Sequence, residues 1–240
     1  MINILIPSCG STEFFENSYY PKTLYEVRGL PMIQHVIDNF KHLKDKHYIF
    51  TFLQSECDRF HTDKVAKLSS NNNDDIIVLK NFTGGALCTC LMAIEYINND
   101  RELIISNNDQ IIDVDFNNVV DIWRKNNADC GVICFNSFHP RWSYVRCDNG
   151  EVVETAEKKP ISDMAIAGLY YFKHGTDFIK CAKSAILKGS TYNGKYYISA
   201  AVNEMILLNK SIDVYKIKSD DYHSFYTPER VRKYERSQVK

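Results

Sequence analysis

The sequence Leu103-Ile104-Ile105-Ser106-Asn107-Asn108-Asp109-Gln110 joins an uninterrupted aliphatic run to a short polar run. Such an aliphatic run is typical of a parallel strand that is buried on both faces. Ligands of open α/β sheets bind at the carboxyl ends of the strands, which is where Asp109 would lie. A carboxylate at that place can hold a divalent cation and, through it, a triphosphate. Asp109 could equally cap the following turn, so this stretch leaves two roles open for it.

Strands and helices alternate on both sides of this stretch. Strands are predicted at residues 3–6, 47–52, 76–79 and 103–105, and helices at residues 31–40, 57–68, 86–97 and 116–125. In the first of these helices, Pro31 would occupy the favoured first position. The alternation predicts an α/β fold with a single doubly wound, mostly parallel sheet and right-handed crossovers.

The pattern changes in the second part of the chain. Further strands are predicted at residues 130–135, 143–147, 151–155, 165–172 and 212–217, and helices at residues 177–187, 199–208 and 228–235. The segment Cys147-Asp148-Asn149-Gly150 indicates a tight hairpin. Because no repeat or long linker interrupts the chain, we expect residues 1–240 to form one domain with a mixed sheet.

Composition limits the kinds of partner. The chain has 29 basic and 30 acidic residues, and this balance gives no support to nucleic acid or an anionic membrane as the main partner. The chain has no apolar run of the roughly 18 residues that a membrane helix needs. It also does not begin like a signal peptide, so we expect a cytoplasmic protein. The eight cysteines form no CxxC pair, and we expect free, mostly buried thiols.

Two loops of small residues are candidates for phosphate and nucleotide binding. Ser8-Cys9-Gly10-Ser11 follows the first strand, where Gly10 lacks the Cβ that would block backbone N–H groups from a phosphate. Thr83-Gly84-Gly85-Ala86 opens a predicted helix. A single glycine is a weak signal, and Thr83 could simply cap its helix.

The order and spacing of several motifs resemble the sugar nucleotidyltransferase family, in particular its surface-polysaccharide and capsule branch. These enzymes make nucleotide sugars from a nucleoside triphosphate and a sugar 1-phosphate. The motifs are Ile4-Leu5-Ile6-Pro7-Ser8-Cys9-Gly10, Pro21-Lys22-Thr23-Leu24-Tyr25-Glu26-Val27-Arg28-Gly29-Leu30-Pro31-Met32-Ile33, Thr83-Gly84-Gly85-Ala86, Ser106-Asn107-Asn108-Asp109-Gln110, Ala156-Glu157-Lys158-Lys159-Pro160, Gly168-Leu169-Tyr170-Tyr171-Phe172 and Tyr222-His223-Ser224-Phe225-Tyr226-Thr227-Pro228-Glu229.

The resemblance implies a Rossmann-like, GT-A-type nucleotidyltransferase fold. Residues 1–127 would bind the nucleotide, and residues 128–240 would bind the sugar or other acceptor. It implies catalytic roles for Lys22 against the α-phosphate, Asp109 on Mg²⁺ and Lys158 on the phosphate of the acceptor. The implied nucleotide-binding residues are Ser8, Cys9, Gly10, Ser11, Thr83, Gly84, Gly85 and Ser106. The implied substrate-binding residues are Gln110, Glu157, Gly168, which would leave room for the sugar, and Asn203. His223 would be a second metal ligand.

Several of these residues also have ordinary structural interpretations. Lys22 could be a solvated surface lysine, and Lys158 could lie in an exposed turn. His223 could be a structural histidine. Asp113-Val114-Asp115 resembles the DxD motif of glycosyltransferases, but its position favours a cap for the helix at residues 116–125.

The chain departs from the family pattern at two places. Many members carry an arginine in the glycine-rich loop, whereas this chain has Glu13 there and no cation, so another cation must serve or triphosphate binding is weak. The candidate replacements are Arg28, Arg141 and Lys195. Near the C-terminus, His223-Ser224-Phe225-Tyr226 stands where members often supply a second metal-binding aspartate.

These departures keep two other functions open. One is a glycosyltransferase of related fold that uses a nucleotide sugar, and the other is a non-catalytic subunit that binds a nucleotide sugar. The aromatic residues Tyr192, Tyr196 and Tyr197 are expected to be exposed and could serve the interface of a homo-oligomer.

Overall fold

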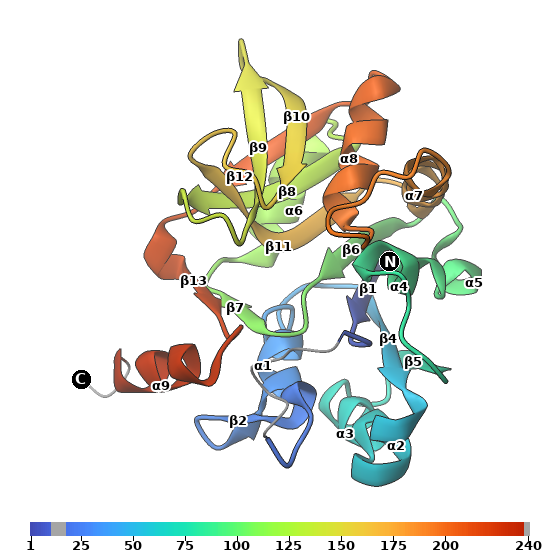
Figure 1. Cartoon of the computed structure of the whole chain (residues 1–240), viewed down its shortest axis with the longest axis vertical. Helices are drawn as coiled ribbons and strands as arrows, with labels where there is room; N and C mark the ends of the chain where they lie inside the picture. The colour runs from blue at the N-terminus through green and yellow to red at the C-terminus, as the bar shows by residue number, and fades with distance from the viewer. Residues whose placement is uncertain (11–17, 238–240) are drawn as a thin grey trace.

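A computed structural model describes residues 1–10 and 18–237 of the chain. Within these residues, nine strands form one mixed sheet, whose parallel part has the order β6-β1-β4-β5. These four strands are β1 (Ile2–Pro7), β4 (Lys46–Leu53), β5 (Asp74–Leu79) and β6 (Glu102–Ser106). They are the four strands predicted in the first part of the chain, and their carboxyl ends lie at the same edge of the sheet (Figure 1).

The other part of the sheet is largely antiparallel. Its strands are β8 (Cys130–Asn136), β9 (Ser143–Asp148), β10 (Glu151–Glu157), β11 (Met164–Phe172) and β12 (Ile212–Lys216). β11 runs antiparallel to β6 and so joins the two parts, while β12 runs parallel to β8. β9 and β10 form the predicted hairpin, which projects at the top of Figure 1.

Helices cover both faces of the sheet. They are α1 (Met32–Asp38), α2 (Gln54–Phe60), α3 (Thr62–Ser69), α4 (Ala86–Leu91), α5 (Ile94–Ile97), α6 (Phe116–Lys125), α7 (Gly175–Leu187), α8 (Ile198–Leu207) and α9 (Pro228–Ser237). Side chains of α1, α3 and α6 pack on one face with Ile4 and Ile104, whereas those of α4, α7 and α8 pack on the other with Leu5 and Ile105. This arrangement confirms the predicted doubly wound α/β fold.

Helix boundaries differ from the prediction at three places. The helix expected at residues 57–68 is two helices, because His61 adopts a positive φ of 55° between them. The helix expected at residues 86–97 is interrupted at Met92 and Ala93. Pro31 lies just before α1 rather than inside it and forms part of a short strand.

Two small sheets were not predicted. β2 (Glu26–Val27) pairs with β3 (Leu30–Pro31), and β7 (Gln110–Ile112) pairs antiparallel with β13 (Tyr222–Ser224). The second pair is extended by a hydrogen bond from the Phe225 N–H to the Asp109 carbonyl, 2.8 Å long. The C-terminal segment is thereby fixed beside Asp109.

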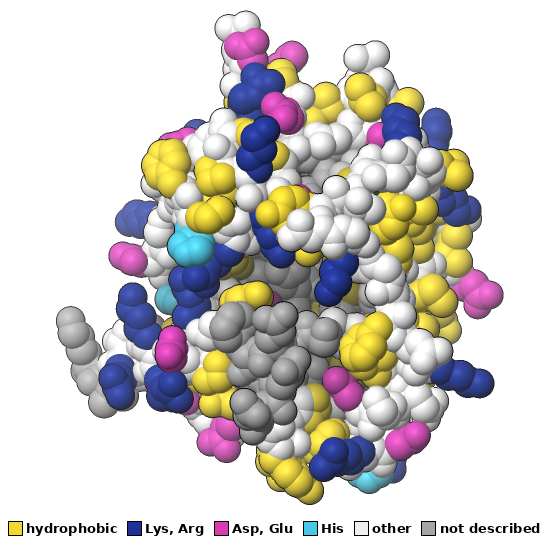
Figure 2. Space-filling view, in the orientation of Figure 1, with side chains coloured by type: hydrophobic (Ala, Val, Ile, Leu, Met, Phe, Trp, Pro, Cys, Tyr) yellow, Lys and Arg dark blue, Asp and Glu magenta, His cyan; other side chains and the backbone are white. Residues whose placement is uncertain are grey.

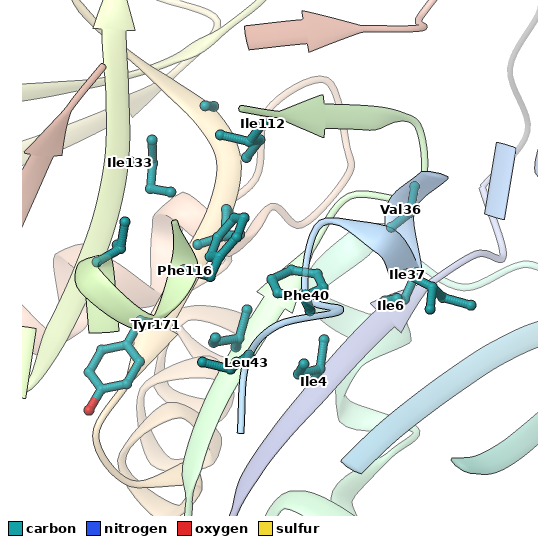
Figure 3. Close-up of a cluster of buried hydrophobic side chains, with 14 of the residues drawn as sticks. Ile4, Ile6, Val36, Ile37, Phe40, Leu43, Ile112, Phe116, Ile133 and Tyr171 are labelled. Atoms are coloured by element: carbon teal, nitrogen blue, oxygen red, sulfur yellow. The ribbon is translucent and has the colours of Figure 1, made fainter. Parts of the chain in front are cut away.

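The core on the α1 and α6 face is rich in aromatic and branched side chains (Figure 3). Phe40 and Phe116 have ring centroids 4.7 Å apart, so the end of α1 and the start of α6 meet over Ile4 of β1. Burial of such side chains stabilises the fold by roughly 1.5–3 kcal/mol each. This packing fixes the parallel strands whose carboxyl ends carry the polar loops.

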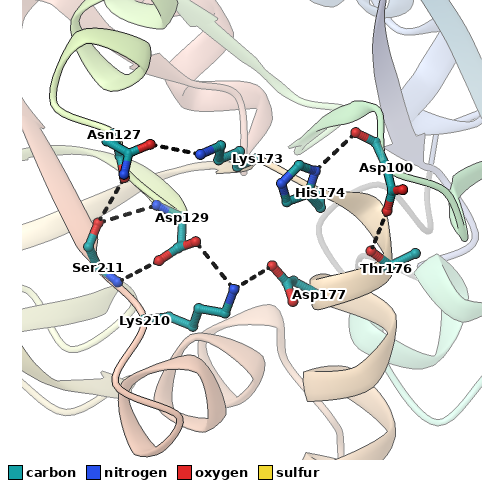
Figure 4. Close-up of polar contacts among 9 residues, drawn as sticks. All are labelled: Asp100, Asn127, Asp129, Lys173, His174, Thr176, Asp177, Lys210 and Ser211. Atoms are coloured by element: carbon teal, nitrogen blue, oxygen red, sulfur yellow. Dashed lines mark hydrogen bonds and ion pairs between the residues drawn. The ribbon is translucent and has the colours of Figure 1, made fainter.

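A polar cluster joins elements of the second part of the chain at the place where β8 and β12 begin (Figure 4). Lys210 donates to Asp177 of α7 at 2.9 Å and to Asp129 at 3.3 Å, and the hydrogen bond to Asp177 raises the pKa of the lysine. Asp129 also accepts a hydrogen bond from the Ser211 N–H. These contacts hold the start of β8 and the start of β12 against α7.

All eight cysteines are free thiols, as expected. Among the described helices, none combines the length and apolarity that spanning a membrane requires.

Gly131 of β8 provides a test of core packing. A Cβ at this position would lie 2.4 Å from Cε2 of Trp123, whose fully buried ring stacks on Tyr171. We expect Gly131→Ala to lower the free energy of unfolding by about 1–3 kcal/mol, because the indole must shift within a close-packed core.

Chemical denaturation would measure this loss. Gly10→Ala is the matched control, since nothing lies within 4 Å of a Cβ there. Equal stability of the two variants would contradict the packing around Trp123.

Candidate active site

An ion pair between Lys22 and Asp109 forms the centre of the candidate site. Lys22 lies in the 3-10 helix η2 (Lys22–Leu24), and Asp109 follows β6. The lysine Nζ and the aspartate Oδ2 are 2.9 Å apart, and their side chains are only 14% and 11% exposed. Asp109 therefore lies beyond the carboxyl end of a buried parallel strand, as the sequence predicted, with its carboxylate on a lysine rather than on a helix cap.

A second carboxyl group, Glu56 of α2, lies close to this pair. Burial raises the pKa of Glu56 to about 7, and the charge of Lys22 opposes this shift. Its Oε2 atom is buried and has no hydrogen-bond partner among the described residues. Sequence reasoning missed this group, because a glutamate early in a helix is ordinary.

The loop after β1 offers fewer groups for phosphate binding than the sequence predicted. The Ser8 N–H donates to the Thr51 carbonyl at 3.1 Å, so Ser8 continues the pairing with β4 and its N–H is not directed at a ligand. Cys9 is 3% exposed, and burial raises the pKa of its thiol to about 11. Gly10 is exposed, and no described residue has an atom within 4 Å of where a Cβ would lie. The predicted ligand Ser11, together with Glu13, lies outside the described residues.

The Thr83-Gly84-Gly85 turn is built against a second loop. The Tyr196 N–H donates to the Gly84 carbonyl at 2.9 Å, and a Cβ on Gly85 would lie 2.4 Å from the Tyr196 carbonyl oxygen. Gly85 also has a φ of 131°, which side chains rarely adopt. The Thr83 hydroxyl bonds to Thr89 and the Gly85 carbonyl. The close approach of Tyr196 explains why glycine occupies both positions. Gly84 remains exposed, as its predicted contact with a base requires.

Three predicted ligand residues form a buried network instead. Gln110 is 0% exposed, and its Nε2 donates to Ser106 Oγ and to the Gly168 carbonyl. Ser106 is equally buried. A Cβ on Gly168, which has a φ of 57°, would lie 2.2 Å from Asn107 and 2.6 Å from Gln110. Ser106 and Gln110 are thus engaged in contacts within the protein, and the space beside Gly168 is filled by amide side chains. Their direct contacts with a ligand stay a prediction.

The part of the site that was predicted to bind the acceptor is organised around Lys158. Burial opposes its charge, but its bond to the Tyr197 hydroxyl, with an Nζ–O distance of 3.1 Å, and nearby negative groups raise the pKa of Lys158 overall. Burial also raises the pKa of the neighbouring Glu157, against hydrogen bonds from the hydroxyls of Ser143 and Ser199. Lys158 is thus half-buried among side chains that interact with its charge.

Two further predictions on this side are corrected. The Asn203 amide donates to the Thr155 carbonyl at 2.8 Å and accepts from the Thr155 N–H at 2.7 Å, so it ties α8 to β10 and does not face a sugar. Tyr192 and Tyr197 are half-buried, and their rings flank the Lys158 ammonium at 5.7 and 5.0 Å. They belong to the site rather than to an exposed interface.

The residues near Asp109 fit a magnesium ion that a substrate completes. Mg²⁺ usually takes one or two carboxylates, several waters and substrate phosphates. Asp109 offers its Oδ1, which accepts no hydrogen bond from the described residues. His223 Nε2 lies 2.9 Å from Asp113 Oδ2 instead, so a metal-binding role for His223 stays a prediction. Across residues 1–10 and 18–237, no three acidic, histidine or cysteine side chains form a preformed metal cluster.

The three candidate replacement cations lie in different places. Arg28 is in the β2–β3 turn, where its N–H bonds to Glu235 of α9. Lys195 neighbours Tyr196, which binds the glycine turn. Arg141 lies on the acceptor side, over the rings of Trp142 and Tyr226. Asp115 caps α6 by accepting from the Asn117 N–H, which confirms the structural interpretation of the DxD sequence.

Comparison with known proteins identifies the family. Residues 17–214 match the family model described as nucleotidyl transferase. The chain belongs to the nucleotidyl transferase family. The resemblance seen in the sequence motifs is thereby confirmed, and the chain is classed among enzymes that transfer nucleotidyl groups. Comparison with curated protein sequences gives no match.

Two solved structures share the fold of this nucleotidyl transferase family member. The nucleoside-diphosphate-sugar pyrophosphorylase from Vibrio cholerae RC9 is 20% identical with a TM-score of 0.84, and the match covers 98% of this chain and 100% of that one. The inositol-1-phosphate CTP transferase from T. maritima is 10% identical with a TM-score of 0.74, and the match covers 95% of this chain and 90% of that one. Similarity at these identities establishes the fold.

Glu56 gives a prediction about pH. A carboxyl group with a higher pKa in the folded protein binds its proton more tightly there, so folding is favoured below its ordinary pKa of 4.5 and this advantage is lost as the pH rises to about 7. We expect Glu56→Gln to raise the Tm clearly at pH 8 and much less at pH 5.

Thermal unfolding at the two pH values would measure the difference, with the exposed Glu151→Gln as control. An equal change in Tm at both pH values would mean that folding does not perturb Glu56.

Proposed function

We propose that this protein is a Mg²⁺-dependent nucleotidyltransferase that joins a nucleoside triphosphate to a sugar phosphate or phospho-alcohol, with release of pyrophosphate. The observation that carries the proposal is the buried Lys22–Asp109 ion pair beyond the carboxyl end of β6, in a chain of the nucleotidyl transferase family. The family motifs further support a cytoplasmic role in making nucleotide sugars for surface polysaccharides.

For the nucleotide, Lys22 is the group that would stabilise the transition state. Its ammonium would bind the α-phosphate and offset the negative charge that builds up as an acceptor oxygen attacks phosphorus. Asp109 holds Lys22 in place beforehand, so little reorganisation is needed at the moment of reaction. A bound Mg²⁺ would supply charge neutralisation for the phosphates, with Asp109 as its ligand.

On the acceptor side, Lys158 would hold the attacking phosphate. Its position is fixed from two directions, because its N–H donates to the Trp142 carbonyl at 3.0 Å and its ammonium donates to Tyr197. Gly84 and Gly85 would border the base. These positions support a division of labour in which residues 1–127 bind the nucleotide and residues 128–240 bind the acceptor.

The test is pyrophosphate release from each common nucleoside triphosphate with Mg²⁺, across a panel of sugar 1-phosphates and phospho-alcohols. Release that requires one triphosphate and one acceptor would support the proposal. Hydrolysis of, or transfer from, a nucleotide sugar without any response to triphosphate would favour a glycosyltransferase, and tight binding of a nucleotide sugar without turnover would favour a binding subunit.

The ion pair itself makes a sharper prediction. Asp109→Asn and Lys22→Gln should each lower kcat by at least about 100-fold, the range seen when a transition-state-stabilising donor is removed. Because the two residues act together, the double variant should lose little more than either single variant.

Steady-state kinetics would measure the three variants after circular dichroism shows that they are folded. Asp121→Asn on α6 is the matched control, since among the described residues its exposed carboxylate pairs with Arg124 alone. Additive losses in the double variant, or retained turnover in Asp109→Asn, would overturn the assigned roles.

A further inference from the structure

Two arginines from distant segments share one indole ring. Arg141 precedes β9 and Arg230 lies in the first turn of α9, and their guanidinium carbons are 5.7 and 6.0 Å from the ring centroid of Trp142. Arg141 also lies 5.8 Å from the ring of Tyr226. Stacking on aromatic faces fixes the planes of guanidinium groups and leaves their edges available for hydrogen bonds.

Neither arginine has a carboxylate partner among the described residues. Burial lowers the pKa of Arg230, and the like charge of Arg141 lowers it further. A cation in the first turn of a helix also opposes the helix dipole. The side chain of Arg141 is held by the ring of His139, which offers no negative charge. Within residues 1–10 and 18–237, the fold thus brings two positive charges together without a carboxylate to pair with them.

The arginine pair is connected to the candidate site. The Trp142 carbonyl accepts from the Lys158 N–H, and Tyr226, whose ring Arg141 covers, contributes to the charge environment of Lys158. The ring centroids of Trp142 and the buried Tyr222 are 5.6 Å apart. The Tyr222 hydroxyl donates to the side-chain oxygen of Gln110, the neighbour of Asp109. In the face shown in Figure 2, Lys and Arg side chains lie on both sides of a hollow at the centre of the view.

The arginines are a second set of cations besides Lys158. Ring contacts of Tyr222 and Trp142 connect the guanidinium groups to Gln110, whereas Lys158 is the cation proposed to hold the attacking phosphate of the acceptor. An anion held by Arg141 and Arg230 would then be a different group from the attacking phosphate. Paired guanidinium groups suit a planar carboxylate, because each can donate two parallel hydrogen bonds.

We propose that the acceptor carries a second acidic group besides its phosphate, and that Arg141 and Arg230 bind this group. The acceptor class is then a phosphorylated sugar acid or another phosphorylated carboxylic acid. This inference rests on the proposed nucleotidyltransferase function and narrows its second substrate.

Matched acceptors test the proposal. Glucose 1-phosphate and glucuronic acid 1-phosphate differ by one carboxylate, as do galactose and galacturonic acid 1-phosphate, and phosphoethanolamine and phosphoserine. We expect kcat/KM for the acidic member of the accepted pair to exceed that of the neutral member by about tenfold or more. Arg141→Gln and Arg230→Gln should each remove most of this preference and leave the neutral member unchanged, whereas the exposed Arg232→Gln should leave both unchanged.

Each contrary outcome has a distinct meaning. Equal losses for acidic and neutral acceptors would place the arginines on the common phosphate, and a higher KM for the triphosphate would place them on the nucleotide; either result overturns the inference while the proposed function stands. If no pair releases pyrophosphate, the proposed function fails, and calorimetric binding of the same pairs decides. Tighter binding of the acidic members that depends on Arg141 would support the inference, and no difference within any pair would overturn it.

Discussion

The buried ion pair of Lys22 and Asp109 is the interaction on which the arrangement of this site depends. Removing two charges from water costs several kcal/mol per ion, and their attraction often only offsets that cost. Such a pair is thus weak support for stability, and the chain adds Glu56 nearby, whose buried oxygen has no hydrogen-bond partner within residues 1–10 and 18–237. A lysine that must meet a triphosphate is better held in position by a carboxylate than left to solvent, because its ordering then precedes binding.

The loop that carries Asp109 is held by contacts that reach across the chain. Gln110 is fully buried and bonds to Ser106, Gly168 and Tyr222, which come from the end of β6, from β11 and from β13. Gly168 needs its positive φ and its missing Cβ for this packing. The Gln110 side chain, next to the candidate metal ligand Asp109, thereby positions the loop through contacts with the protein. Its hydrogen-bond partner Tyr222 extends these contacts to Trp142 and to the region where the acceptor is proposed to bind.

Local signals explain which parts of this structure could be predicted. The aliphatic run before Asp109 and the Asn149-Gly150 turn specify a buried strand and a hairpin from neighbouring residues alone. The break at His61 left no such signal, because a histidine in a left-handed conformation looks like any other helical residue in sequence. Ser8 and Asn203, for which ligand contacts were predicted, each bond to the backbone of a residue that is distant in sequence, Thr51 and Thr155 respectively. Whether a polar side chain faces a ligand or the protein is decided by such tertiary contacts.

The distribution of cations bears on the missing loop arginine. Of the three candidate replacements, Arg141 lies over the ring of Tyr226, which contributes to the charge environment of Lys158, and Arg28 lies in a turn next to α9. Lys195, beside the glycine turn, is the one placed near the expected base. Within the described residues, the triphosphate would therefore depend mainly on Lys22 and on the metal held by Asp109. Lys158, Arg141 and Arg230 instead concentrate positive charge where we propose that the acceptor binds, which is the arrangement expected if the acceptor carries a second acidic group.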